Sequence, residues 1–396
     1  MTLYWLLSVP AQGDGHIAWR DVKNRVGDSE VYDFTLPMFK IGTLDTLVRL
    51  SDELAKYDAA YENTTGKFID TLRSMTGLNN ASLASLLTVE DKPVDQYIGT
   101  FTWNNSRFRS DKALPEIVGQ IADAMGTIDA AMKTKMTQYN ALRNSLATVK
   151  RKQNGNLSVR SLNGIVTGDD CIAPESEYLR TAFVAVPINF TREWANSYEH
   201  LADMVVPRSS KKIAEDSEYV LYSVVLFKRV FDEFSTKARD SRFIVRDYVY
   251  DEDAIERDRA MATEIVEQEE ELLDNITEWL KGSFGDVMAA WIHIKALRVF
   301  VESILRYGIP PDFLPVLVKP NLKQATRIKQ QLIDFYAYLE TSASASARAT
   351  MAGKAKPKKA YSPDDSAFDM QEFSTILSDY TPFVFFDIPW TFLDSD

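Results

Sequence analysis

The sharpest hydrophobic pattern in the chain spans residues 290–313 and reads AWIHIKALRVFVESILRYGIPPDF. Its apolar residues recur at helical spacing and form a stripe that is broad enough to be buried on more than one side. Gly308 stands where a left-handed C-cap is needed, and Pro310 and Pro311 prevent the helix from continuing. The pattern therefore predicts a core helix that ends at Gly308.

Two further segments show helical periodicity over long distances. The first runs from about residue 110 to residue 152, ends in three basic residues, and would be roughly 60 Å long as one helix. The second, residues 251–274, carries eleven acidic residues against Arg257 and Arg259, a net charge of -9, yet its apolar residues keep helical spacing. We therefore expect two long helices, the second with an acidic face.

The pattern between these two helices changes to alternating strand and helix. Segments 178–186, 219–227 and 243–250 are rich in Val, Tyr, Phe and Leu, as strands are, and helical stretches at 192–204 and 228–238 separate them. This order predicts a small α/β domain.

The two ends of the chain each contain a strand-like apolar segment, at residues 2–9 and 383–388. A mixed loop is expected after the first, followed by an amphipathic helix over about 43–72, and a further helix is expected at 323–339. Pairing the two terminal strands would cover two apolar edges that are otherwise prone to aggregation. We therefore expect one base domain built from both termini.

Together these elements predict a mixed α/β, helix-rich fold in which the first long helix leads the chain outward and the second brings it back. The expected shape is an elongated dumbbell with an α/β head, a neck of long antiparallel helices and a foot built from both chain termini. The expected boundaries are 1–110 (foot), 111–162 (neck), 163–250 (head), 251–281 (neck) and 282–396 (foot). A stretch near 341–363 is repetitive, basic and poor in apolar residues, which predicts a disordered loop.

Composition narrows the class of protein. The 396 residues are 45% hydrophobic, which is enough for sizeable cores. The chain contains neither a run of eighteen apolar residues nor a signal-peptide pattern. We therefore expect a soluble cytosolic protein with no membrane span. One cysteine and three scattered histidines offer no disulfide or metal-binding spacing, so no metal or cofactor is expected. A net charge of -12 disfavours nucleic acid as a partner and leaves other proteins.

Candidate chemistry is sparse. The P-loop pattern is absent, because Phe68 and Ala355 stand where the Ser or Thr after Gly-Lys is required. His293 has no nucleophile beside it in the local sequence, which favours a packed core histidine over a general base. Arg208, Lys211 and Lys212 follow Pro207 in a basic turn that could either meet an acidic helical partner or only keep a loop soluble.

The organising segment WIHIKALRVFVESILRYGIPPDF closely resembles part of the C subunit of the vacuolar-type proton ATPase (V-ATPase). Similar stretches are MTLYWLLSVPAQ at the start, KIGTLDTLVRLSDELAKYD from Lys40, VVPRSS from Val205 and KARDSRFIVRDYVYDED from Lys237. These blocks follow the family order across nearly the whole chain. None of them is a catalytic motif, so what the chain does is implied by the resemblance and not by chemistry.

The resemblance implies a dumbbell with foot, neck and head that acts as a non-catalytic connector in ATP-driven proton transport. Its implied partners are peripheral-stalk heterodimers of E- and G-type subunits and the N-terminal cytosolic domain of the large a-type membrane subunit, and it is implied to take part in reversible sector assembly. The implied location is the cytoplasm and the cytosolic face of a vacuolar or other acidic-organelle membrane. Actin is a further candidate partner, for the lysines of 352–360. The alternative is a cytosolic hydrolase or transferase with a site in the α/β head.

Overall fold

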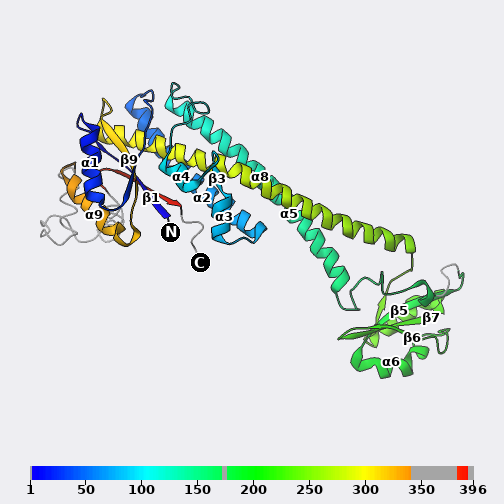
Figure 1. Ribbon diagram of the computed structural model, residues 1–396. Helices are drawn as coiled ribbons and strands as arrows, with labels where there is room; N and C mark the ends of the chain where they lie inside the picture. Colours follow the sequence, from blue (N-terminus) through cyan, green and yellow to red (C-terminus); the bar gives the residue numbers. More distant parts are fainter. Residues whose placement is uncertain (1, 172–175, 340–380, 391–396) are drawn as a thin grey trace, which may run out of the picture. The chain divides into compact units, whose positions relative to one another are not determined.

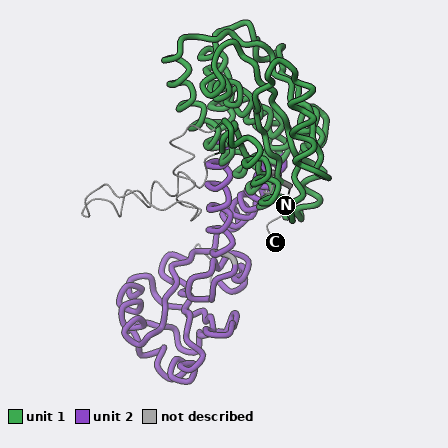
Figure 2. Tube along the Cα trace, turned by 90° about the vertical axis from the view of Figure 1, so that its left-hand side faces the viewer, with its two compact units in different colours: residues 1–133, 275–396 green, residues 134–274 purple. Residues whose placement is uncertain are grey.

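The computed structural model describes residues 2–171, 176–339 and 381–390 (Figure 1). The expected disordered loop near 341–363 lies outside these residues. The chain forms two compact units, one from residues 1–133 and 275–396 and the other from residues 134–274 (Figure 2). The described helices and strands are mixed and rich in helix, as the sequence predicted.

The first unit is built on a four-stranded antiparallel sheet in the order β10-β1-β9-β2. Its strands are β1 (Thr2–Pro10), β2 (Glu30–Asp33), β9 (Phe313–Lys319) and β10 (Val384–Trp390). The predicted pairing of the two terminal strands is confirmed, with Leu6 opposite Phe386. Strands β2 and β9 were not predicted: β2 has only four residues, and β9 contains a proline.

One face of this sheet is covered by α1 (Gly15–Val26) and α9 (Ala325–Phe335). The sequence predicted a mixed loop after β1, and that prediction was wrong, because α1 forms there. The helix was missed because it buries only a narrow stripe, Ala18, Val22 and Val26, in an otherwise polar sequence. Asp14 caps the helix by accepting a hydrogen bond from the backbone N–H of His16. Alternate residues of β1 and β9 pack against this stripe and form one core.

The unit contains further helices outside this core. The predicted amphipathic helix is confirmed as α2 (Leu44–Thr76), which begins at the N-cap Thr43 and ends at Gly77 in a left-handed conformation. Short elements follow it: α3 (Asn80–Leu86), β3 (Thr88–Val89), β4 (Lys92–Pro93) and α4 (Val94–Gly99). The next long helix, α5 (Leu114–Asn154), is one element of 41 residues, as its periodicity predicted.

The organising helix is longer than the sequence indicated. Helix α8 (Glu252–Tyr307) is continuous over 56 residues, so the predicted neck helix at 251–281 and the predicted core helix are one element. Gly285 does not break it; a Cβ at this position would lie 3.1 Å from the carbonyl oxygen of Thr88, so glycine allows the β3 backbone to approach closely. The predicted end is confirmed, since Gly308 has φ +90° and donates its N–H to Ile304 O at 2.9 Å.

The second unit contains a four-stranded antiparallel sheet in the order β6-β7-β5-β8. Its strands are β5 (Leu179–Pro187), β6 (Lys211–Glu215), β7 (Tyr219–Phe227) and β8 (Ile244–Arg246). β5 and β7 match the prediction, β8 is shorter than the predicted 243–250, and β6 was not predicted because its exposed lysines are typical of a loop.

Helices cover one face of this second sheet. α6 (Thr191–Ser197) and α7 (Phe231–Asp240) pack on Ala182, Val184 and Val224 through Trp194 and Phe234. The other face packs Phe183 and Leu221 against residues 157–166. Across both units, the short 3-10 turns among the described residues are η1 (Gly168–Asp170), η2 (Ile188–Phe190), η3 (Tyr198–His200), η4 (Lys228–Val230), η5 (Leu322–Gln324) and η6 (Tyr336–Leu339).

Candidate interaction surfaces

His293 is a packed core residue of the first unit, as the sequence predicted. It is 1% exposed, and its ring contacts Phe101, Trp103 and Phe108. Nδ1 lies 2.7 Å from the carbonyl oxygen of Ala289, and Nε2 accepts the backbone N–H of Asn104 at 3.2 Å. Burial lowers the pKa of His293 to about 4, so the imidazole is neutral at neutral pH.

A buried ionic cluster that the sequence did not reveal surrounds Asp58 on α2. The carboxylate, 2% exposed, accepts hydrogen bonds from Trp291 Nε1 at 2.8 Å and from an Arg298 guanidinium nitrogen at 2.7 Å. Lys295 Nζ lies 3.0 Å from the same carboxylate and donates to the Asp387 carbonyl at 2.7 Å. These contacts join α2, α8 and β10, so the cluster holds the first unit together. Asp58 precedes Trp291 by 233 residues, and no local pattern links it to the residues of α8.

The three basic residues predicted to bind a partner lie in the second unit, but the structure does not place them in one turn. Arg208 is exposed, has φ +58°, and donates its backbone N–H to Glu199 Oε1 at 2.9 Å. Lys211 and Lys212 begin the edge strand β6, opposite Ser223 and Tyr222 of β7.

Neighbouring residues of a strand point to opposite faces of the sheet, so the two lysines do not share a surface. Lys211 lies on the face of Leu221 and its ammonium is 2.6 Å from Asp170 Oδ1, whereas Lys212 lies on the other face and pairs with Glu215. The hydrogen bond to Asp170 raises the pKa of Lys211 and lowers that of Asp170. Both lysine charges are therefore partly neutralised within the chain.

Arg208 differs from the two lysines because its charge is not paired in the same way. No ion pair to its guanidinium is found within the described part of the chain, while its backbone is fixed through Glu199, which also accepts the Tyr198 hydroxyl at 2.9 Å. The hydrogen bond from Arg208 N–H, followed by that from Tyr198, holds the pKa of Glu199 below its usual range. Of the three predicted residues, Arg208 offers the charge that is most accessible to a partner.

The first unit exposes a group of apolar side chains at one end. Leu44 and Val48 at the start of α2 are 63% and 49% exposed, and Ile309, just after α8, is 67% exposed. A hydrogen bond from Ser51 to Glu302, with the Asp58 contacts to Arg298, shows that α2 and α8 run antiparallel here, so these residues lie at the same end. Met38, 73% exposed, lines a cavity of about 300 Å³ there. Sequence periodicity missed this surface because it treats Leu44 and Val48 as core positions.

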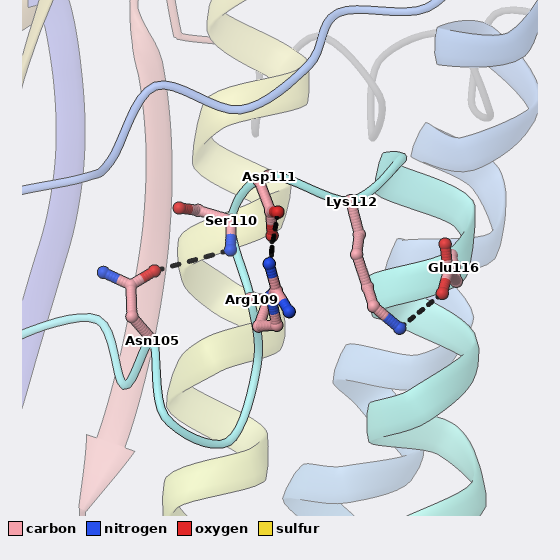
Figure 3. A network of polar contacts seen from close by, with 6 residues as sticks. All are labelled: Asn105, Arg109, Ser110, Asp111, Lys112 and Glu116. Atoms are coloured by element: carbon pink, nitrogen blue, oxygen red, sulfur yellow. Dashed lines mark hydrogen bonds and ion pairs between the residues drawn. The ribbon is translucent and has the colours of Figure 1, made fainter.

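A polar network lies on the surface where the chain enters α5 (Figure 3). The guanidinium of Arg109 makes two hydrogen bonds to Asp111, at 3.0 and 2.7 Å, and Lys112 Nζ lies 2.5 Å from Glu116 Oε1. Exposed pairs of this kind contribute little stability. The two pairs join neighbouring residues of the loop and of the first turn of α5.

Within the described ranges, no group of three or more His, Cys, Asp and Glu residues could hold a metal ion, and a helix with the length and hydropathy of a membrane span is not found there either. Arg208 on the second unit and the apolar group on the first are therefore exposed features that another protein could contact. Exposed features of these two kinds are typical of a protein that makes contacts with other proteins.

The comparisons with known proteins identify the family. The family profile described as the V-ATPase C subunit matches residues 4–384. The V-type proton ATPase C subunit of Caenorhabditis elegans is 36% identical over 99% of this chain and 98% of its own length, and the C 1 form of that subunit from Xenopus tropicalis is 34% identical over all of both chains. The Arabidopsis thaliana protein of the same name is 35% identical over 83% of this chain and 88% of its own. The chain belongs to the family of V-ATPase C subunits.

This membership confirms the resemblance seen in the sequence. It identifies a non-catalytic subunit of an ATP-driven proton pump and sets aside the alternative of a cytosolic hydrolase or transferase. A solved structure, the cytoplasmic N-terminal domain of the V-ATPase I subunit, which is a homolog of the a-type subunit, covers 83% of this chain and 95% of its own, at 13% identity and a TM-score of 0.26. That likeness is too weak to support any argument.

Proposed function

We propose that this chain is a connector that bridges two kinds of partner: peripheral-stalk heterodimers of E- and G-type subunits, and the N-terminal cytosolic domain of the large a-type membrane subunit. The observation that carries the proposal is the division of the chain into two compact units, each with its own core and its own exposed feature. A protein that binds partners through two units can resist torque between them.

The proposed architecture is a dumbbell in which the units are a foot and a head. The foot comprises 1–110 and 282–396, the head comprises 163–250, and the neck consists of residues 111–162 and 251–281. Two features of α5 and α8 support the proposed neck. Each helix is continuous, and the residues of each helix belong partly to one unit and partly to the other.

The head is proposed to bind one stalk heterodimer through the surface around Arg208, with Lys211 and Lys212 contributing less because each already pairs with a carboxylate. An accessible guanidinium suits an acidic helical surface, since it offers several donors to carboxylates. Such a contact should weaken with rising salt.

The foot is proposed to bind its partners through the apolar group of Met38, Leu44, Val48 and Ile309. Exposed apolar side chains that gather in one place are typical of protein contact sites. Each contact would be moderate, and binding at one unit would raise the effective concentration of the other unit at its own partner. Losing one contact would then release the protein, which is compatible with reversible assembly of the two sectors.

This role would place the chain in the cytoplasm and, when assembled, on the cytosolic face of a vacuolar or other acidic-organelle membrane. Actin remains a further candidate partner, for the lysines of 352–360, which lie outside the described residues.

The proposal is tested by binding of the full chain to purified E/G heterodimer, measured as a dissociation rate. Arg208→Glu should speed dissociation by roughly tenfold at low salt and by less at high salt. Lys237→Glu is the matched control, because Lys237 is an exposed cation of the same unit that pairs with Glu233 at 2.6 Å. No binding of the native chain would overturn the connector function. Normal binding with equal effects of the two reversals would overturn only the assigned surface.

A further inference from the structure

The loop that carries Arg208 runs beside the end of β7. Phe227 donates its backbone N–H to the carbonyl oxygen of Met204 at 3.4 Å, and Val206 donates its N–H to the carbonyl oxygen of Val225 at 2.9 Å. The start of the loop is therefore held against the strand by backbone hydrogen bonds. Met204 and Arg208, four residues apart, leave the same short stretch of chain at this strand end.

Met204 and Arg208 both have a left-handed backbone. Their φ angles are +67° and +58°, a region that residues other than glycine adopt rarely and at a cost in free energy. The side chain of Met204 does not repay this cost by filling the core, because it is 41% exposed. Strained residues cluster where a protein binds its partners, so a role in binding accounts for a methionine at this position better than packing does.

The sulfur of Met204 is in contact with a second arginine. Arg229 is exposed in η4, and its Nε–H donates to Met204 Sδ at 3.2 Å while a terminal nitrogen contacts the same sulfur. A thioether is a weak acceptor without charge, so this contact orients the guanidinium and does not neutralise it. No ion pair to Arg229 is found in the described part of the chain.

Two more exposed side chains adjoin this pair. Lys228, the residue before Arg229, donates its backbone N–H to the carbonyl oxygen of Tyr178 at 2.9 Å, and Tyr178 is 66% exposed. Lys228 is exposed as well, and its ammonium has no ion pair among the residues that the structure describes. We call Tyr178, Met204, Arg208, Lys228 and Arg229 the β7-end surface.

The charge of the β7-end surface indicates its partner. Glu177 and Asp203 are exposed acids that precede two of its members in the chain, against three cations in the surface itself. Asp203 also acts on Lys237, whose pKa is raised by a hydrogen bond to Glu233 and, to a smaller extent, by Asp203. The surface therefore keeps an excess of positive charge beside two exposed apolar side chains, which suits an acidic partner that has apolar side chains of its own.

We propose that the β7-end surface binds an acidic amphipathic helix of the stalk heterodimer. Met204 and Tyr178 contact the apolar side chains of that helix, and the three cations pair with its carboxylates. A helix suits this mixed surface because it presents apolar and acidic side chains close together, three or four residues apart, and methionine adapts to irregular apolar surfaces. The inference rests on the proposed connector function and adds an apolar contact to it.

The experiment measures dissociation of the full chain from purified E/G heterodimer at low and high salt. Met204→Ala should speed dissociation about fivefold at both, because salt does not screen an apolar contact. Arg229→Glu should speed it by roughly tenfold at low salt and by less at high salt. The matched controls are Met261→Ala, at a 60% exposed methionine of α8, and Arg239→Glu, at an exposed arginine near the other end of α7.

Met204→Gly separates binding from a structural role. Glycine adopts a φ of +67° without strain, so this variant should melt no lower than the native chain while its complex dissociates at least as fast as that of Met204→Ala. Failure of the native chain to bind would overturn the connector function and this inference with it. Native binding with equal rates for Met204→Ala and Met261→Ala, a Met204→Ala effect that vanishes at high salt, or a lower melting temperature of Met204→Gly would overturn this inference alone.

Discussion

Individual side chains of this protein are best understood through their buried partners. His293 was predicted from the sequence to be a packed core residue, because no nucleophile stands beside it in the local sequence. The reason that it stays neutral is visible only in the structure, where three aromatic rings and a backbone N–H surround the imidazole. Protonation at Nε2 would place two donors, that nitrogen and Asn104 N–H, against each other.

The first prediction concerns pH and His293. In the folded state its pKa is lowered to about 4, whereas in the unfolded state it has the ordinary value of 6.5. Between these values the unfolded chain binds the extra proton, so the stabilising contribution is complete above pH 6.5 and is lost as the pH falls toward 4. The loss from this residue should approach about 3 kcal/mol at pH 4.

Urea unfolding at pH 7 and pH 4.5 measures this effect. His293→Gln should be less stable than the native chain at pH 7, and the difference between the two should shrink by roughly 2–3 kcal/mol at pH 4.5. His200→Gln controls for removing an exposed histidine. A stability difference that stays constant with pH would contradict the buried neutral imidazole.

The second prediction concerns the cluster around Asp58. Asp58→Asn leaves the ammonium of Lys295, a residue only 4% exposed, without a full counter-charge. Breaking a buried ion pair from one side costs about 3–5 kcal/mol, and the unfolding free energy should fall by that order. Glu53→Gln, an exposed acid on the same helix, should change it by less than about 0.5 kcal/mol. Similar effects of the two substitutions in chemical denaturation would show that the cluster is not holding α2, α8 and β10 together.

At the level of elements, helix α8 shows that helical periodicity predicts where a helix lies but not where it begins. The sequence predicted a helix at 251–274 and a separate core helix from residue 290, where the structure has one element. Gly282 and Gly285 lie between the two predicted segments and have a low helix propensity, yet they do not break the helix. Packing against the β3 backbone explains the difference, because the absence of a Cβ at Gly285 allows the Thr88 carbonyl to approach α8.

The third prediction compares Gly285 and Gly282, three residues apart in α8. Gly285→Ala should lower the unfolding free energy by about 1–3 kcal/mol, because the new Cβ would press on the Thr88 carbonyl. Gly282→Ala should raise it by up to about 1 kcal/mol, since a Cβ there meets nothing within 4 Å and alanine favours helix. Thermal and urea unfolding of the two variants provide the measurement, and stabilisation by both would show that the approach of β3 is not tight.

For the whole molecule, the proposed dumbbell makes a fourth prediction. A compact globule of 396 residues should have a radius of gyration of about 21 Å. Two units separated by a helical neck should exceed this clearly and give a distance distribution with a long tail. Small-angle scattering of the monomer that returns the globular value, with one symmetric peak, would contradict the neck.

The sequence by itself determined the long helices, the pairing of the terminal strands, the two central strands of the second sheet and the family. The helices depend on helical periodicity sustained over many residues, and the family depends on blocks that resemble it, such as those from Lys40 and Lys237. The strands depend on their apolar composition, and the pairing of the terminal strands depends on the need to cover two apolar edges. These signals are strong because many residues contribute to each of them.

Only the tertiary structure decided the rest, because the deciding contacts join residues far apart in the chain. The structure shows that Lys211 and Lys212, predicted to lie in a basic turn, belong to the edge strand β6 and point to opposite faces of the sheet, while Arg208 lies before the strand and stays accessible. It also brought Asp58 on α2 to Lys295 on α8. Strand pairing and burial depend on which residues are neighbours in space, and a linear sequence pattern does not contain that information.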